Sequence, residues 1–306
     1  MGAPRDTITV TFGDACENHA GMQRLGRMAA QGFSDADLAS AAAALRAAGV
    51  AVVELVDLRA CLADDVALFA AAPSAPILIA RGAVDALAPG GADALRAELR
   101  ALDFDTKAYM RGRVVNKHAR HNLCIADAPQ EPDYANKRGR VVEWAAVPRL
   151  AALRAALEAL GPAWAGLTAE LNLYYDPARC GIGYHGDGER RKVVGVRLGA
   201  PLPLQYYWFR EGCAAGRPAR FELRHGDLYV MGEKAAGTDW MTRKRFTLRH
   251  AAGSASFLAL RPEQRGPATQ NEPLAPCETG APEAPEAPEP APPLADDDPL
   301  WAELGL

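Results

Sequence analysis

Short strand-like segments fill the second half of the chain and constrain its fold more than any other feature. After Gly166, runs of β-branched, aromatic and leucine residues are separated by Gly, Pro and Asp, which favour turns. The runs are residues 170–175, 192–198, 203–209, 220–223, 227–231 and 247–250. Many short strands at this spacing predict a sandwich or a barrel. An amphipathic helix rich in Ala and Leu is expected at residues 147–160.

The first third of the chain alternates strand-like and helix-like segments. Residues 7–12, 50–56 and 76–80 have strand patterns, and residues 35–48 and 92–102 have apolar residues at helical spacing. This order predicts a small, partly parallel α/β layer. We therefore expect an α+β protein, with a small α/β domain of unknown role in residues 1–105 and a β-rich domain in residues 106–262.

Residues 263–306 are expected to be a disordered tail rich in Pro, Ala and Glu. Nine acidic residues and no Lys or Arg lie in 271–306, so leaving this segment out changes the formal net charge from −4 to +5. The mildly basic remainder permits an anionic substrate or nucleic acid. Near the end, Trp301 and Leu304 form an apolar face, for which docking to a protein partner and a frayed terminus are both open interpretations.

Neither the cysteines nor the apolar segments indicate a secreted or membrane protein. The six cysteines are widely scattered and form no Cys-x-x-Cys, which favours free thiols in a reducing compartment. The apolar stretch 41–56 is interrupted by Arg46 and Glu54, and no signal-peptide pattern begins the chain. We expect an intracellular protein, cytoplasmic or nuclear, without membrane contact.

A glycine pattern at Gly181, Gly183 and Gly186 matches a dinucleotide-binding loop in spacing alone. That mechanism needs a helix N-terminus directly after the glycines. The following segment, 192–198, is strand-like, so the pattern does not predict a nucleotide-binding fold.

The same segment contains His185 and Asp187, two residues apart. Side chains two apart on an extended segment share a face, so an imidazole and a carboxylate can bind one metal ion. Asn172 and Tyr174 also share a strand face, as do Arg243 and Arg249. Because arginine forks bind carboxylates well, these residues could hold a small dicarboxylate beside the metal.

With these features, residues 172–253 resemble the AlkB-like 2-oxoglutarate- and Fe(II)-dependent dioxygenases. The matching features are Asn172-x-Tyr174, His185-x-Asp187, the strand 194–199, the turn His225-Gly226-Asp227, and Arg243-x5-Arg249. The resemblance, which extends over roughly residues 109–260, implies a double-stranded β-helix (jelly roll) with flanking helices. It implies Fe(II) bound by His185 and Asp187, and 2-oxoglutarate bound by Asn172, Tyr174, Arg243 and Arg249. O2 is then the other reactant.

One part of the family pattern is missing, namely a histidine shortly before the paired arginines. Residues 233–242 contain none. His250 is our first choice for the third metal ligand, although simple alternation points it away from Arg249 unless a bulge intervenes. Asp239, or no third protein ligand, remain the alternatives. His225 is interpreted as part of a structural turn.

The resemblance makes a nucleobase or nucleic acid the first expectation for the substrate. The expected reaction is hydroxylation of a C–H bond or oxidative demethylation of an N-methyl group. The segments around Arg120, His121 and Tyr134 resemble the family's substrate-facing lid, and the basic stretch 111–120 is compatible with phosphate contacts. A hydroxylase of a protein or small molecule, and a catalytically inactive AlkB-fold binding module, are the alternatives.

Overall fold

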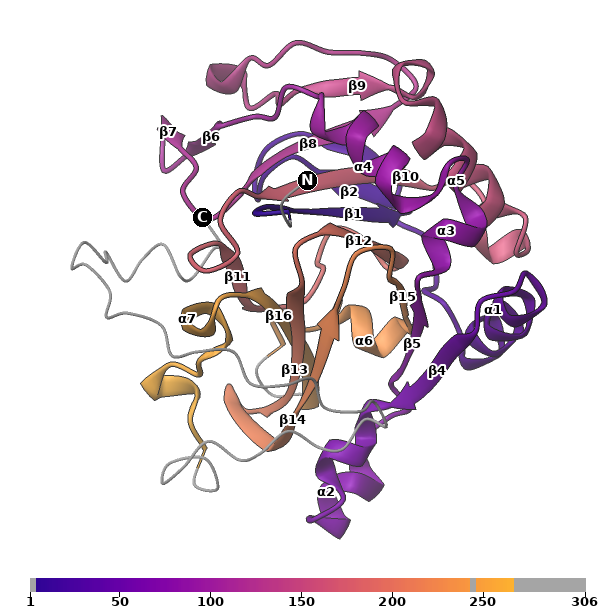
Figure 1. The fold of residues 1–306 in the computed structure, drawn as a ribbon. Helices are drawn as coiled ribbons and strands as arrows, with labels where there is room; N and C mark the ends of the chain where they lie inside the picture. Colours follow the sequence, from indigo (N-terminus) through magenta and orange to yellow (C-terminus); the bar gives the residue numbers. More distant parts are fainter. Residues whose placement is uncertain (1–3, 243–245, 267–306) are drawn as a thin grey trace.

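Two β-sheets face each other, and helices cover the outer face of the larger one (Figure 1). The computed structural model describes residues 4–242 and 246–266. In order, the larger sheet contains β4 (Val52–Asp57), β5 (Pro76–Arg81), β15 (Leu228–Met231), β12 (Val193–Gly199), β1 (Thr7–Gly13), β10 (Thr168–Tyr174), β8 (His121–Ala126) and β9 (Val141–Glu143). The smaller sheet contains β11 (Gly181–His185), β16 (Phe246–Gly253), β13 (Leu202–Arg210) and β14 (Cys213–Leu223). This mixed structure, mostly sheet, is compatible with the expected jelly roll.

The N-terminal strand β1 lies in the interior of the larger sheet. It pairs antiparallel with β10 on one side and with β12 on the other. Ile8, Val10 and Phe12 point to the outer core, whereas Thr9 and Thr11 line the space between the sheets. The period of two, apolar on one face and threonine on the other, explains why this segment forms a strand buried on both sides.

The strands of the first 105 residues are therefore part of the same sheet as the later strands. β5 pairs with β15, and β4 pairs with β5 at the edge. All pairings of β1, β4 and β5 are antiparallel, so the expected partly parallel layer is wrong. The reason lies in the order of the strands. After β1 the chain passes through α1 to β4, at the far edge of the sheet, and β4 and β5 then pair as antiparallel neighbours. The larger sheet thus contains strands from both sides of residue 105, where a domain boundary was expected.

Helices pack on the outer face of the larger sheet and form the main core with it. These helices are α1 (Asp35–Ala47), α3 (Ala83–Leu87), α4 (Gly91–Arg100) and α5 (Pro148–Glu158). α1 begins where Ser34 and Asp37 form a capping box, which satisfies free backbone N–H groups at its start. Leu38 and Leu45 then face the sheet from α1, and Leu150 and Leu157 do so from α5.

A second core fills part of the space between the two sheets. Trp208 and Phe221 of the smaller sheet pack there with Ile79 and Met231 of the larger one. The indole of Trp208 donates a hydrogen bond to the carbonyl of Leu58, 2.9 Å away, in the turn η1 (Leu58–Leu62). The adjacent aromatic residues Tyr206 and Tyr207 are buried as well, so this aromatic run is part of the packed interior.

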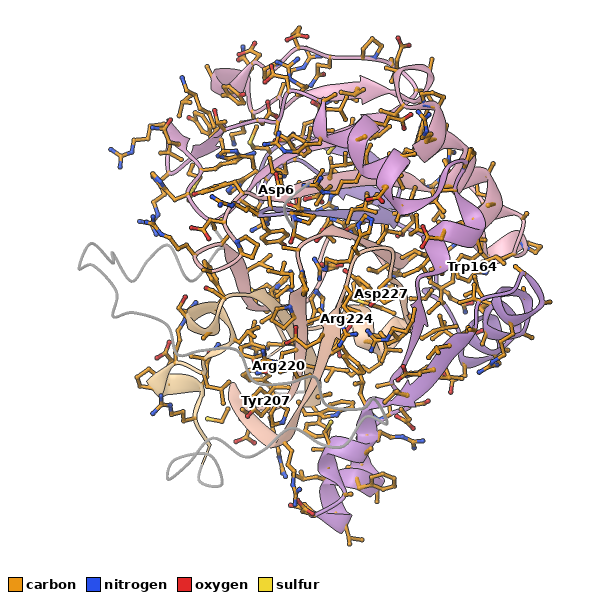
Figure 2. The ribbon with its side chains drawn as sticks, viewed as in Figure 1. Asp6, Trp164, Tyr207, Arg220, Arg224 and Asp227 are labelled. Atoms are coloured by element: carbon orange, nitrogen blue, oxygen red, sulfur yellow. The ribbon has the colours of Figure 1, made fainter. Side chains whose placement is uncertain are left out.

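The His225-Gly226-Asp227 turn is structural, as expected. Asp227 is buried and accepts hydrogen bonds from the backbone N–H groups of Arg224 and Gly82, at 2.9 and 3.0 Å (Figure 2). It also pairs with Arg81 at 2.9 Å. His225 accepts a hydrogen bond from the N–H of Gly199. The turn thus fixes the start of β15 against the end of β12.

The remaining elements surround these layers. They are the hairpins β2 (Ala15–Glu17)–β3 (Arg24–Gly26) and β6 (Lys107–Met110)–β7 (Arg113–Asn116), the helices α2 (Val66–Ala71), α6 (Glu233–Ala236) and α7 (Ala255–Leu258), and the 3-10 turns η2 (Tyr134–Asn136), η3 (Trp144–Ala146), η4 (Pro162–Trp164) and η5 (Pro262–Gln264). Five cysteines in the described ranges are free thiols. Within those ranges, no helix has the length and apolar composition needed to cross a bilayer. The expected tail, with Trp301 and Leu304, lies almost entirely outside the described residues, as does Arg243.

Candidate metal centre

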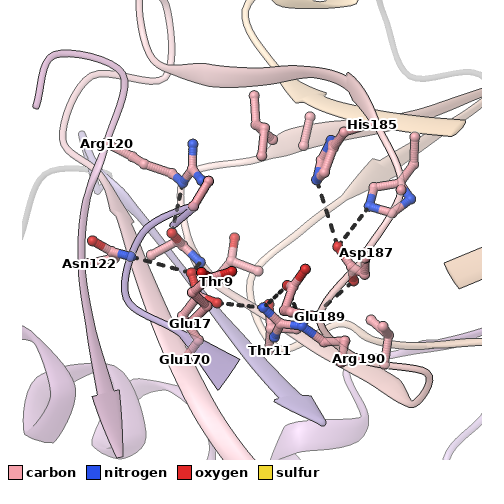
Figure 3. Close-up of a pocket in the computed structure, with 18 of the residues that line it drawn as sticks. Thr9, Thr11, Glu17, Arg120, Asn122, Glu170, His185, Asp187, Glu189 and Arg190 are labelled. Atoms are coloured by element: carbon pink, nitrogen blue, oxygen red, sulfur yellow. Dashed lines mark hydrogen bonds and ion pairs between the residues drawn. The ribbon is translucent and has the colours of Figure 1, made fainter. Parts of the chain in front are cut away.

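A cavity of about 440 Å³ opens between the inner faces of the two sheets. Its walls carry charged and polar side chains from both sheets and from the loops that connect them (Figure 3). Thr9, Glu170 and Asn172 come from the larger sheet, and His185 and His250 come from the smaller one.

His185, Asp187 and His250 converge on one wall of this cavity. One potential ligand atom from each of the three lies within 4.8 Å of the others. The distances from Asp187 Oδ1 are 3.8 Å to His185 Nε2 and 3.7 Å to His250 Nε2. Two imidazoles and a carboxylate on one face, with open space beside them, are the donor set of a mononuclear Fe(II) site. The residues present therefore fit a ferrous ion.

Local backbone structure brings these three side chains together. His185 at the end of β11 is the direct register partner of His250 on β16. The ladder of β11 is irregular between Ile182 and His185. Asp187 is held by its N–H, which donates to the carbonyl of Ala236 at 2.9 Å. A Cβ on Gly186 would lie 2.1 Å from the Gly237 carbonyl oxygen, so this close approach requires glycine.

A hydrogen bond orients His185, and burial favours the neutral form of His250. The Nδ1–H of His185 can donate to the carbonyl of Gly183, 2.8 Å away, which leaves Nε2 as the free lone pair facing Asp187. Burial lowers the pKa of His250 well below its usual value, and the nearby His185 lowers it further. Burial raises the pKa of Asp187, while Arg190 and His185 oppose this effect.

A buried network connects Asp187 to the larger sheet. Arg190 lies 3.9 Å from Asp187 and forms ion pairs of 2.6 Å with both Glu170 and Glu189. Glu170 in turn accepts a hydrogen bond of 3.0 Å from Asn172. The Nε of Arg120 donates to the other end of the Asn172 amide at 2.8 Å. Figure 3 shows this chain of contacts running from Arg120 to Asp187.

Several predicted site residues reach the cavity. Asn172, Tyr174 and Arg120 line it together with the three candidate ligands. His121 and Tyr134 do not. The ring of His121 packs against Tyr175 at 4.8 Å, and the hydroxyl of Tyr134 donates to Asp105 at 2.8 Å. Of the three predicted substrate residues, the structure therefore brings Arg120 to the cavity.

The structure does not bring Arg249, predicted to bind the cosubstrate, to the wall of the cavity. Its guanidinium lies 4.2 Å from the ring centroid of Phe209, on the face of β16 opposite to His250. Neighbouring residues of a strand point to opposite faces, so Arg249 and His250 cannot both face the cavity. The alternative ligand Asp239 instead pairs with Lys234 at 2.7 Å.

Sequence reasoning missed several charged residues of this cavity. Glu170 precedes Asn172 by two positions and so shares its strand face, which was a usable signal. Arg197 is the single charged residue in the apolar segment Val193–Gly199, and a lone charge inside a buried strand was another. Thr9 gave no signal, because its role depends on a strand placement that is distant in sequence.

The chain is similar to one protein family and to one viral protein. Residues 86–237 match the family model of the 2OG-Fe(II) oxygenase superfamily. An uncharacterized protein of Acanthamoeba polyphaga mimivirus is 41% identical over 254 residues, which cover 83% of this chain and 98% of that protein. The first match identifies residues 86–237, just under half of the chain, as part of a 2OG-Fe(II) oxygenase. Its cofactors are accordingly Fe(II) and 2-oxoglutarate, and the His185, Asp187 and His250 cluster is the matching site in the structure.

Proposed function

We propose that the protein is an AlkB-like dioxygenase that hydroxylates a C–H bond or oxidatively removes an N-methyl group, with a nucleobase or nucleic acid as its substrate. The observation that carries this proposal is the convergence of His185, Asp187 and His250 on the wall of an open cavity. These three residues would hold Fe(II). When bound, the iron supplies O2 activation, with 2-oxoglutarate as the reductant.

The side chains of the cavity would bind and orient the cosubstrate. Asn172 and Tyr174 face the space beside the metal ligands from β10. Burial raises the pKa of Tyr174, although Arg120 and Arg197 oppose the effect. The phenol therefore keeps its proton at neutral pH and can donate a hydrogen bond to a carboxylate.

Cationic residues near the cavity support an anionic substrate. Arg24 and Arg120 line the cavity itself. The β6–β7 hairpin, which Figure 1 shows on the same side of the molecule as β11, exposes Lys107, Arg111 and Arg113. The chain runs directly from β7 to Arg120, so the hairpin and the cavity are close along the sequence. Phosphates bind to such exposed cations, and an extruded base could then enter the cavity.

The first test measures succinate formation from 2-oxoglutarate with Fe(II) and ascorbate. Single-stranded oligonucleotides that carry N-methylated bases are compared with unmodified ones, and formaldehyde release is followed in parallel. The proposal predicts turnover that methylated oligonucleotides stimulate and that His185→Ala abolishes. His118→Ala, an exposed histidine outside the cavity, is the matched control.

Other outcomes would support the alternatives. Turnover that peptides or small molecules stimulate, but oligonucleotides do not, would indicate a hydroxylase of a protein or small molecule. Oligonucleotide binding without any turnover would indicate an inactive binding module. Arg111→Glu should weaken oligonucleotide binding and reduce its salt dependence, whereas Arg210→Glu, on an exposed end of β13, should not.

A further inference from the structure

One guanidinium is buried in the cavity wall without an anionic partner. Arg197 of β12 lines the cavity, and its side chain is 1% exposed. Its backbone is fixed, because its N–H donates to Asp227 at 2.9 Å and its carbonyl accepts from Gly226 at 2.8 Å. The cation is therefore held at a defined place in the wall.

The hydrogen-bonding groups of Arg197 are only partly used. Nη1 donates to the hydroxyl of Thr9, the neighbouring residue on β1. Nε and Nη2 are buried without a hydrogen-bond partner among the described residues, and no carboxylate of those residues pairs with the cation. An unpaired buried charge is strongly unfavourable, so this arrangement favours binding of an anion.

The surroundings of Arg197 fit a carboxylate. Thr9 and Asn172 lie beside it in one cross-strand row on the cavity side of the larger sheet. Tyr229 lies against Gly195, where a Cβ would come 1.9 Å from the phenol ring. Burial raises the pKa of Tyr229 to about 12, with Arg197 opposing and Asp187 adding to the effect. The phenol is thus a neutral hydrogen-bond donor, and its pKa depends on the charges of both Asp187 and Arg197.

The other arginines of the cavity are less suited to this role. Arg190 is already paired with Glu170 and Glu189, and Arg120 donates to Asn172. Arg24 is exposed, and Arg249 lies on the opposite face of β16. Arg197 therefore remains as the buried cation that faces the cavity without an acidic partner among the described residues.

We propose that Arg197, oriented by Thr9 of the N-terminal strand, binds the distal carboxylate of 2-oxoglutarate. The assignment rests on the proposed function, because it assumes that the keto acid end binds at His185, Asp187 and His250. It means that a residue from β1 is required for cosubstrate binding.

The test compares two keto acids that differ only in the distal carboxylate, 2-oxoglutarate and 2-oxopentanoate. Their affinities for the Mn(II)-loaded protein are measured by calorimetry, which needs no turnover. Removing one partner of a buried charge pair costs on the order of 100-fold in affinity. We expect Arg197→Met to lose about that factor for 2-oxoglutarate while 2-oxopentanoate affinity stays nearly unchanged. Thr9→Val should show the same selective loss at about 10-fold.

The controls separate this assignment from the proposed function. Arg220→Met, at an exposed arginine of β14, should leave both affinities unchanged. If Arg197→Met fails to fold, Arg197→Lys replaces it, and we expect a selective loss there too because lysine cannot form the two-pronged contact. If these variants still prefer 2-oxoglutarate over 2-oxopentanoate as strongly as the wild type does, the assignment of Arg197 is overturned. The proposed function would not be affected by that result. A wild-type protein that binds Mn(II) but neither keto acid would overturn the proposed function as well.

Discussion

His185 and His250 face each other across the β11–β16 ladder, with their ring centroids 4.5 Å apart and the rings inclined at 62°. This register brings together two residues that are 65 positions apart in the sequence. Asp187 lies close to both histidines because only Gly186 separates it from His185 along the chain. The metal centre is thus a consequence of strand pairing in the smaller sheet.

The third ligand can be identified by substitution. His250→Ala should weaken Fe(II) binding by more than the roughly 10- to 100-fold typical of changes in outer contacts, because it removes a ligand. Asp239→Asn should leave the affinity nearly unchanged, since Asp239 pairs with Lys234. Anaerobic Fe(II) titration of both variants measures the difference. The reverse order of effects would assign the ligand to Asp239.

Arg190 is expected to support the metal site without touching the metal. Arg190→Gln removes the cation that opposes the rise in the pKa of Asp187, and it leaves Glu170 and Glu189 without their shared partner. Fe(II) affinity should fall by about 10- to 100-fold. Arg191→Gln is the control, because Arg191 is the next residue along the chain and forms an exposed ion pair with Glu233. Equal affinities in the two variants would show that the network does not act on Asp187.

Because the amine of Lys117 is buried, the free energy of unfolding should depend on pH in the alkaline range. Burial lowers its pKa from 10.5 to about 8 in the folded protein. Between these values the unfolded chain binds more protons, so the free energy of unfolding rises as the pH increases from 8 to 10.5. The rise should be up to about 3 kcal/mol relative to Lys117→Met. Chemical denaturation at several pH values measures it, and parallel pH curves for the two proteins would contradict it.

The N-terminal strand should be essential for folding. Phe12 of β1 is fully buried, and Phe12→Ala should lower the free energy of unfolding by about 3–5 kcal/mol. Val52→Ala, at a half-exposed position on the edge strand β4, should have a much smaller effect. Thermal and denaturant unfolding compare the two. A protein that begins at residue 106 should not fold, because β10 and β12 would lose the strand between them; cooperative unfolding of that truncated protein would show otherwise.

Local pattern predicted the longer helices and strands, because each has a period that can be read directly. Residues 35–48 gave the helix Asp35–Ala47 with its Ser34 cap, and residues 203–209 gave the strand Leu202–Arg210. The position of β1 could not be predicted, because a strand pattern does not specify its neighbours. The two-domain expectation followed from this missing information.

The same limit explains the results for the site. His185 and Asp187 were recognised because both belong to one short segment. His250 was the first choice for the third ligand, but the sequence did not specify that its strand pairs with β11. Arg249 was assigned from spacing, but the alternation of β16 turns it to the other face. Thr9 and Arg197 become neighbours only through the β1–β12 register.

Anomalous diffraction from crystals soaked anaerobically in Fe(II) or Mn(II) tests the metal centre most directly. We predict a single strong peak in the cavity, roughly 2.0–2.3 Å from one nitrogen of His185, one nitrogen of His250 and a carboxylate oxygen of Asp187. A peak bound by Asp239 in place of His250, or none at this wall of the cavity, would contradict the account.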